Sequence, residues 1–203
     1  MSRSARFRFL QKRCGELRRH LLPVSFSATA SYSTRVLDRA RGYRVLVHAE
    51  IEAYLEDRVK ELMLTAKRAW DADGTPSAVL IALMGYAKSV ATVPSALPTA
   101  SSNSTLRQRL DESVRHHAHR LKENHGIRTR NVLELLLPIG LDESVLDPVW
   151  VAQMDAFGVA RGDIAHGSAM TVSSIDPATE FATVNDLLVG LEYLDEQLNA
   201  LVR

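Results

Sequence analysis

The sequence predicts an all-α protein, an up-and-down helical bundle with negligible β-structure. Apolar residues recur at spacings of three and four along most of the chain, as they do on the buried face of an amphipathic helix. Two Asp-Pro pairs, at residues 147–148 and 176–177, match the preference for Asp at a helix N-cap and for proline directly after it. No run alternates apolar and polar residues between turn residues, as a half-buried strand would. Long helices joined by loops favour a bundle.

Length and composition limit the class of protein. The chain has 203 residues, of which 46% are hydrophobic and 24% charged, which is typical of one folded domain rather than a disordered chain. Its single cysteine, Cys14, excludes a fold stapled by intrachain disulfides. The longest apolar run, residues 78–87, has about half of the roughly 18–20 residues that span a bilayer. We therefore expect a cytoplasmic protein that does not insert into a membrane.

Residues 1–30 are predicted to form a basic N-terminal helix or arm, ahead of a bundle domain over residues 31–203. Residues 1–22 are rich in arginine and contain one acidic residue, a composition also found in organellar transit peptides. Apolar residues at helical spacing instead favour an amphipathic helix that docks on the core or faces RNA; they are Phe7, Leu10, Cys14, Leu17 and Leu21. We expect the helix, and a removed targeting segment is the alternative.

The other elements follow from periodicity and from helix-breaking residues. The dominant helix is predicted over residues 34–72 and stops at the Gly-Thr-Pro of residues 74–76. An apolar helix follows over about 77–91, and the Ser/Thr-rich residues 89–105 predict a long exposed loop. The remaining predicted elements are a charged helix over 106–124, an apolar turn over 132–139, and two helices that begin at 148 and 177.

Charge is unevenly distributed although the net charge is only +1. Residues 1–44 carry eleven Lys/Arg against two acids, and residues 107–130 carry seven against three, together with four of the seven histidines. Residues 131–202 contain twelve acids, one basic residue, Arg161, and one histidine, His166. A lone cation and a lone imidazole five positions apart in an acidic segment make a candidate site.

Arg161 and His166 are suited to the cleavage of RNA, which carries its own nucleophile, the 2′-OH. His166 can accept the 2′-OH proton near neutral pH. Arg161 stays protonated, and its planar fork matches the charge that develops on the phosphate. The expected products are a 2′,3′-cyclic phosphate and a 5′-OH. Asp163 is the nearest acid and is placed to orient either residue. In the structural alternative, Arg161 pairs with an acid elsewhere and His166 caps a helix end.

Two segments resemble the HEPN superfamily, the "higher eukaryotes and prokaryotes nucleotide-binding" domains. Residues 161–167, Arg-Gly-Asp-Ile-Ala-His-Gly, resemble its Arg-x4-His motif. Residues 43–56, Tyr-Arg-Val-Leu-Val-His-Ala-Glu-Ile-Glu-Ala-Tyr-Leu-Glu, are similar to the first helix of its ribonuclease-LS and abortive-infection branch. The resemblance covers roughly residues 34–202. This chain has Gly162 where the family motif usually has a polar residue directly after the arginine.

The resemblance implies a four-helix bundle that dimerises, so that two Arg/His pairs line a shared cleft. It also implies a metal-independent endoribonuclease from a toxin–antitoxin or phage-defence system, with RNA as substrate and with no cofactor and no metal. The alternative is a non-catalytic RNA-binding or protein-interaction module that pairs with a nucleotidyltransferase or an antitoxin. A purely structural helical scaffold is the third reading of the sequence.

His48 and Glu52 are further catalytic candidates, since they lie one helical turn apart and share a face. Glu52 resembles the position where relatives carry an acidic residue near the site. The alternative is structural, with His48 as a half-buried core residue and Glu52 paired with a nearby arginine.

The charged helix supplies three candidates for RNA contacts, Arg115, Arg120 and Lys122. Of its histidines at positions 116, 117 and 119, only His116 and His119 share a face, whereas a transition-metal site needs three or four ligands. We therefore expect a solvated basic helix that contacts phosphates and binds no metal.

Overall fold

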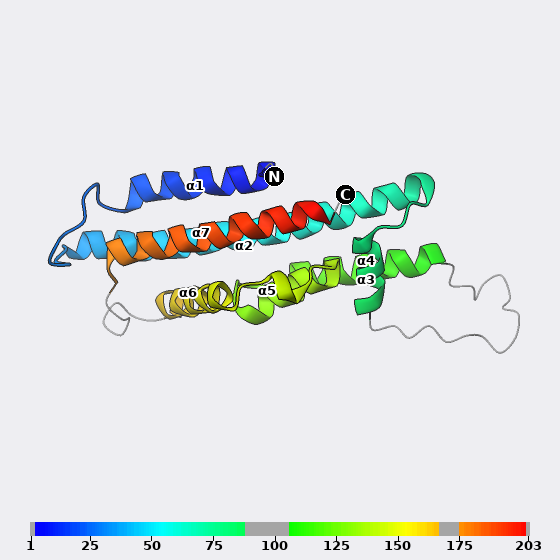
Figure 1. Ribbon diagram of the computed structural model, residues 1–203. Coiled ribbons are helices and arrows are strands. Elements are labelled where there is room, and N and C mark those ends of the chain that lie inside the picture. The colour runs from blue at the N-terminus through cyan, green and yellow to red at the C-terminus, as the bar shows by residue number, and fades with distance from the viewer. Residues whose placement is uncertain (1–2, 88–105, 167–174, 202–203) are drawn as a thin grey trace, which may run out of the picture.

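The computed structural model describes residues 3–87, 106–166 and 175–201, and no strand occurs among them. The all-α prediction is therefore confirmed (Figure 1). The elements are α1 (Ala5–Leu21), α2 (Thr34–Asp73), α3 (Ala78–Tyr86), α4 (Leu106–Lys122), α5 (Thr129–Leu136), the 3-10 turns η1 (Leu137–Ile139) and η2 (Glu143–Val145), α6 (Pro148–His166) and α7 (Pro177–Ala200). None of these helices has the length and hydropathy needed to cross a membrane.

Helix α2 is the axis of the bundle, and every other α-helix of the described chain packs against it. Helices α2 and α7 run side by side, with α1 along one side of them and a layer of α4, α5 and α6 on the other side (Figure 1). The short helix α3 crosses this layer next to α4 and η1. The long helix therefore carries one set of side chains toward α6 and another toward α4.

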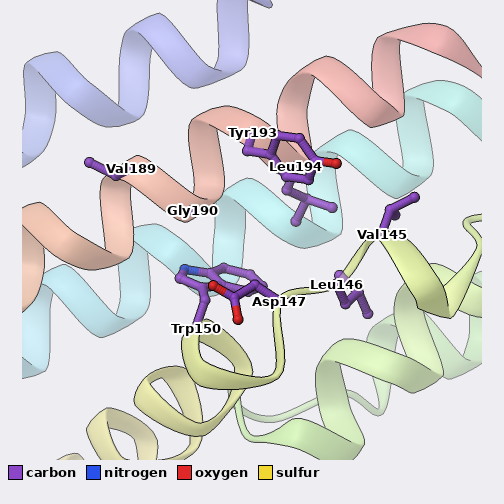
Figure 2. A pocket seen from close by; sticks show the side chains of 8 residues that line it. All are labelled: Val145, Leu146, Asp147, Trp150, Val189, Gly190, Tyr193 and Leu194. Atoms are coloured by element: carbon purple, nitrogen blue, oxygen red, sulfur yellow. The ribbon is translucent and has the colours of Figure 1, made fainter.

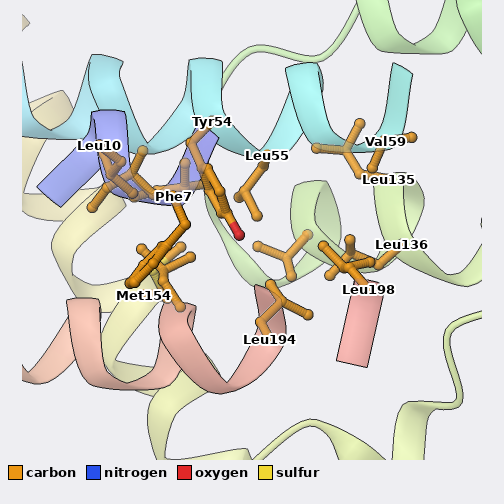
Figure 3. Close-up of a cluster of buried hydrophobic side chains, with 14 of the residues drawn as sticks. Phe7, Leu10, Tyr54, Leu55, Val59, Leu135, Leu136, Met154, Leu194 and Leu198 are labelled. Carbon is orange, nitrogen blue, oxygen red and sulfur yellow. The ribbon is translucent and has the colours of Figure 1, made fainter. Parts of the chain in front are cut away.

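Helix α1 docks on the bundle through its apolar face. Phe7, Leu10, Cys14 and Leu17 are buried, and Leu21 is partly buried against the same core. Figure 3 shows Phe7 and Leu10 beside Tyr54 of α2 and near Leu194 of α7. The amphipathic helix expected from residues 1–22 is thus present and shares its core with the bundle, while a domain boundary at residue 30 stays a prediction.

The Asp-Pro pairs begin helices as the sequence predicts. Asp147 accepts a hydrogen bond from the backbone N–H of Val149 at 2.9 Å, directly before α6. Asp176 accepts one from the N–H of Thr179 at 2.9 Å and caps α7. Each side chain satisfies one of the N–H groups that a helix start leaves without a partner.

Two predicted elements differ from the structure. The helix expected to reach residue 91 ends at Tyr86, and Gly85, a poor helix former, lies in its last turn. The loop expected at 89–105 lies outside the described residues. The apolar turn expected at 132–139 is a full helical segment, α5 followed by η1. It ends at Gly140, where φ is +89° and an added Cβ would lie 3.2 Å from the Cβ of Ala82.

Trp150 joins the start of α6 to the middle of α7. Its indole N–H donates to the carbonyl of Leu187 at 3.2 Å. A Cβ at position 190 would lie 2.1 Å from the indole ring, so glycine is required there. Figure 2 shows the pocket beside this contact, about 190 Å³ in volume and bordered by Val189 and Tyr193.

A buried polar cluster ties α1, α2 and α7 together around Asp195, which has no exposed surface. Its carboxylate accepts hydrogen bonds from the backbone N–H and hydroxyl of Ser4 at 2.7 and 2.6 Å. It also accepts from the hydroxyl of Tyr54 at 3.0 Å and from Nε of Arg58 at 3.1 Å. Ser4 in turn caps α1 by accepting from the N–H of Phe7. The charge of Asp195 is thereby balanced by Arg58 and its acceptor capacity is used.

Candidate functional site

Arg161 lies in the last two turns of α6 and is half-buried. Its Nε is buried and has no hydrogen-bond partner in the described part of the chain. In the structural alternative, Arg161 pairs with an acid elsewhere in the chain. Among the described residues there is no such pair. A partly desolvated guanidinium without an acid is costly to maintain unless an anion binds there.

His48 of α2 lies close enough to this arginine for the guanidinium charge to affect the pKa of its imidazole. Only 2% of its surface is exposed, and its ring stacks on that of Phe157 with centroids 6.5 Å apart. Burial, together with a smaller effect of the positive charge of Arg161, lowers its pKa to about 4. The imidazole is therefore neutral at pH 7. His48 is more deeply buried than the half-buried core residue of the structural alternative.

Glu52 is one turn along α2 and partly exposed. Its Oε2 is 3.6 Å from Nδ1 of His48, which is longer than a hydrogen bond. Among the described residues, Glu52 lies beside the neutral His48 and does not form the ion pair with an arginine that the structural alternative had expected. The structure thus brings together three of the five predicted catalytic residues, Arg161, His48 and Glu52.

The other two candidates lie on the same helix as Arg161. Asp163 is exposed. His166 is the last residue of α6, and its side chain lies outside the described part of the structure. A Cβ at Gly162 would meet nothing within 4 Å, so the helix has room for the polar side chain that the motif usually carries there.

The candidate RNA-binding residues lie in a different part of the bundle. Helix α4 packs on α2 and α3, whereas α6 packs on α2, α5 and α7 (Figure 1). Arg115 and Lys122 are exposed, and Arg120 pairs with Glu134 at 3.3 Å. The structure therefore does not bring these three residues to Arg161 as one site.

The expectation of a wholly solvated α4 is wrong at His117. This side chain is 2% exposed, while His116 and His119 face solvent. Burial lowers the pKa of His117 to about 4, with a smaller contribution from the charge of Arg120. The three histidines thus do not converge, and among the described residues no group of three His, Cys, Asp or Glu side chains is arranged to hold a metal.

Two features of the site were missed in the sequence. Phe157 stacks on His48, and one turn before His48 the guanidinium of Arg44 is bound by two hydrogen bonds to Glu180 of α7. Glu180 is almost fully buried. The spacing of Arg44 and His48 is a signal that they share a face of α2, but Glu180 is 136 residues away from Arg44 and no local pattern points to it.

His48 and His117 are expected to make the protein less stable in acid. Between about pH 6.5 and 4 both are neutral in the folded chain and protonated in the unfolded chain. The unfolded state then binds more protons, so the free energy of unfolding falls as the pH falls, by at most about 1.4 kcal/mol per pH unit for each histidine. Urea denaturation across this pH range measures the slope.

The variant His117→Gln is expected to have a shallower slope than the wild type. It removes one buried titrating group and keeps a hydrogen-bonding side chain. The matched control is His20→Gln, because His20 is exposed. A slope that is the same in His117→Gln and in the wild type would contradict the assignment of a neutral buried imidazole at position 117.

The fold and the site define a class, an all-α bundle in which an arginine near the end of α6, without an acidic partner among the described residues, lies near a buried neutral histidine. A family model described as RiboL-PSP-HEPN matches residues 8–200. The chain therefore belongs to this HEPN family, whose domains are in general nuclease- or RNA-related. Comparison with curated proteins and with solved structures finds no match.

Proposed function

We propose that this protein is a metal-independent endoribonuclease that acts through Arg161 and His166. The observation that carries the proposal is the guanidinium of Arg161, whose buried Nε has no partner in the described chain and lies near a neutral His48. Water is partly excluded there, which strengthens the attraction of the guanidinium for a phosphate. A protonated His48 would add a second positive charge. Because burial keeps His48 neutral, Arg161 carries the only positive charge of these two side chains.

In the proposed reaction, His166 removes the proton from the 2′-OH of the substrate. The 2′ oxygen attacks the phosphorus, Arg161 donates hydrogen bonds to the phosphate oxygens, and the bond to the 5′ oxygen breaks. The leaving 5′ oxygen takes a proton from water or from another side chain, which gives a 5′-OH and a 2′,3′-cyclic phosphate. In this proposal Asp163 and Glu52 orient His166 and Arg161, and the neutral His48 is a neighbour of Arg161.

The test is cleavage of total RNA by the purified protein in the presence of EDTA. Sequencing of the fragment ends is expected to show a 5′-OH and a 2′,3′-cyclic phosphate. Uncut RNA, or cleavage only with a divalent ion, would overturn the mechanism.

Gly162 favours a second candidate function, because it stands where the family motif usually has a polar residue. In that case the chain is a non-catalytic RNA-binding or interaction module, paired with an antitoxin or a nucleotidyltransferase. It would retain RNA in a filter-binding assay and leave the same RNA uncut.

RNA affinity is expected to fall as salt increases, because the basic segments 1–44 and 107–130 neutralise phosphates. Each neutralised phosphate contributes about −0.7 to the slope of log affinity against log salt for a single strand. Lys122→Ala is expected to make this slope shallower, whereas Lys60→Ala, an exposed change on α2 outside both segments, leaves it unchanged. Affinity that does not depend on salt would show that these basic residues serve solubility and do not bind RNA.

We also propose that the active protein is a homodimer, since one Arg/His pair supplies one imidazole for a reaction that needs both a base and an acid. Light scattering of a chain of 22.5 kDa is then expected to give twice that mass. A monomer at micromolar concentration would contradict the shared cleft.

A further inference from the structure

A pocket of about 350 Å³ opens between α2, α6 and α7, next to the candidate site. Its lining includes Phe157 and two alanines of α6, at positions 156 and 160. Polar side chains complete it, from Arg44 of α2, Gln153 of α6 and, on α7, Thr183 and Asp186. The proposed reaction uses none of these polar groups.

The pocket and Arg161 share one face of α6. Phe157 borders the pocket and stacks on His48. Arg161 follows Phe157 by one helical turn, or roughly 6 Å along the helix axis. A strand of RNA whose phosphate binds Arg161 therefore passes the mouth of this pocket with a neighbouring nucleotide.

The chemistry of the lining suits a flat ring that has hydrogen-bonding groups on its edge. Phe157 and the alanines provide an apolar surface, and a single-stranded base can leave its stack to enter such a pocket. The side chains of Gln153, Thr183 and Asp186 make no hydrogen bond within the described chain that would keep them from a ligand. Arg44 differs, because Glu180 holds its guanidinium in place.

Asp186 gives the pocket a preference for bases that carry an amino group. Its carboxylate only accepts hydrogen bonds, so it favours a base edge with an amino group and disfavours one with a carbonyl oxygen. Cytosine and adenine present an amino group at the position where uracil and hypoxanthine present a carbonyl oxygen.

We propose that this pocket binds the base adjacent to the cleaved phosphate and selects a base with an exocyclic amino group. The proposal rests on the endoribonuclease function proposed above. It assigns substrate recognition to Asp186 and Gln153, which lie outside the Arg-x4-His motif.

Binding of short oligoribonucleotides, measured by fluorescence anisotropy, tests the pocket without cleavage when it is done with the His166→Ala variant. Oligoadenosine and oligoinosine are the decisive pair, since their bases are both purines and differ in the amino group. Oligocytidine and oligouridine repeat the comparison for pyrimidines. Roughly tenfold tighter binding of the amino-bearing member of each pair is expected.

Asp186→Asn in the same background is expected to abolish this preference, because the amide also donates a hydrogen bond to a carbonyl oxygen. Glu192→Gln is the matched control, as it removes one negative charge from α7 at a residue that does not line the pocket. Equal affinity for both members of each pair, or an Asp186→Asn variant that keeps the preference, would overturn the proposal.

The two proposals fail in different ways. Oligonucleotide binding with the expected preference, together with no cleavage by the wild-type protein, supports the pocket and contradicts the endoribonuclease. Cleavage of RNA without base preference, and without an effect of Asp186→Asn, supports the endoribonuclease and contradicts the pocket. No detectable binding of any oligonucleotide contradicts both.

Discussion

Arg161→Ala is expected to lower the rate of RNA cleavage by about 10²–10³, because it removes the cation that stabilises the transition-state phosphate. His166→Ala is expected to lower it by about 10²–10⁴, since it removes the base. The double variant is expected to lose little more than the worse single variant, because both residues act in one step. Initial rates on one defined RNA, with EDTA present, measure all three.

Matched controls separate these effects from a general loss of charge. Arg68→Ala removes an exposed arginine of α2, and His20→Ala removes an exposed histidine of α1. Both are expected to cut RNA at the wild-type rate. Arg161→Ala and the two control variants are also expected to melt as the wild type does, because Arg161 makes no ion pair among the described residues and the two control residues are exposed. A His166→Ala variant that cuts at full rate would refute the mechanism and favour the binding module.

Asp195→Ala is expected to lower the free energy of unfolding by about 3–5 kcal/mol, which is the usual cost when one partner of a buried ion pair is removed. The substitution leaves Arg58 buried without this carboxylate and removes the acceptor for Ser4 and Tyr54. Urea denaturation measures the loss. Asp186→Asn, an exposed change on the same helix, is expected to shift the free energy by less than about 0.5 kcal/mol.

Asp195→Asn refines this expectation. The amide keeps one acceptor oxygen for Arg58 and Tyr54, but it places a donor or a neutral oxygen against the N–H and hydroxyl of Ser4. Its stability is expected to lie between that of Asp195→Ala and that of the wild type. An Asp195→Ala variant as stable as the wild type would show that the buried cluster does not hold α1 to α7.

The helices could be predicted from the sequence because their signals are local. The helix expected over residues 34–72 is α2, Thr34–Asp73, and the N-caps at Asp147 and Asp176 are confirmed. Burial of His117 was also encoded locally, since it continues the spacing of Leu110 and Leu121 on the buried face of α4. The charge of that helix masked the pattern.

The site could be predicted only in part, because its geometry depends on which helices face each other. The Arg-x4-His spacing predicts Arg161 as a site residue, but nothing near it in the sequence shows that its charge acts on His48. The same holds for the pair of Arg44 and Glu180. Such contacts join residues more than a hundred positions apart, and periodicity within one helix does not determine them.

The contact between Ser4 and Asp195 joins residues 191 positions apart, and it affects how the chain folds. Contacts of such long range slow folding, because a large loop closes before they form. During synthesis, α1 and α2 leave the ribosome early and can pair at once, whereas Asp195 arrives with the last helix. Until then the N-terminal cap of α1 lacks its buried acceptor. A chain that stops before α7 already carries Arg161 and His166, yet it lacks the carboxylate that completes the bundle.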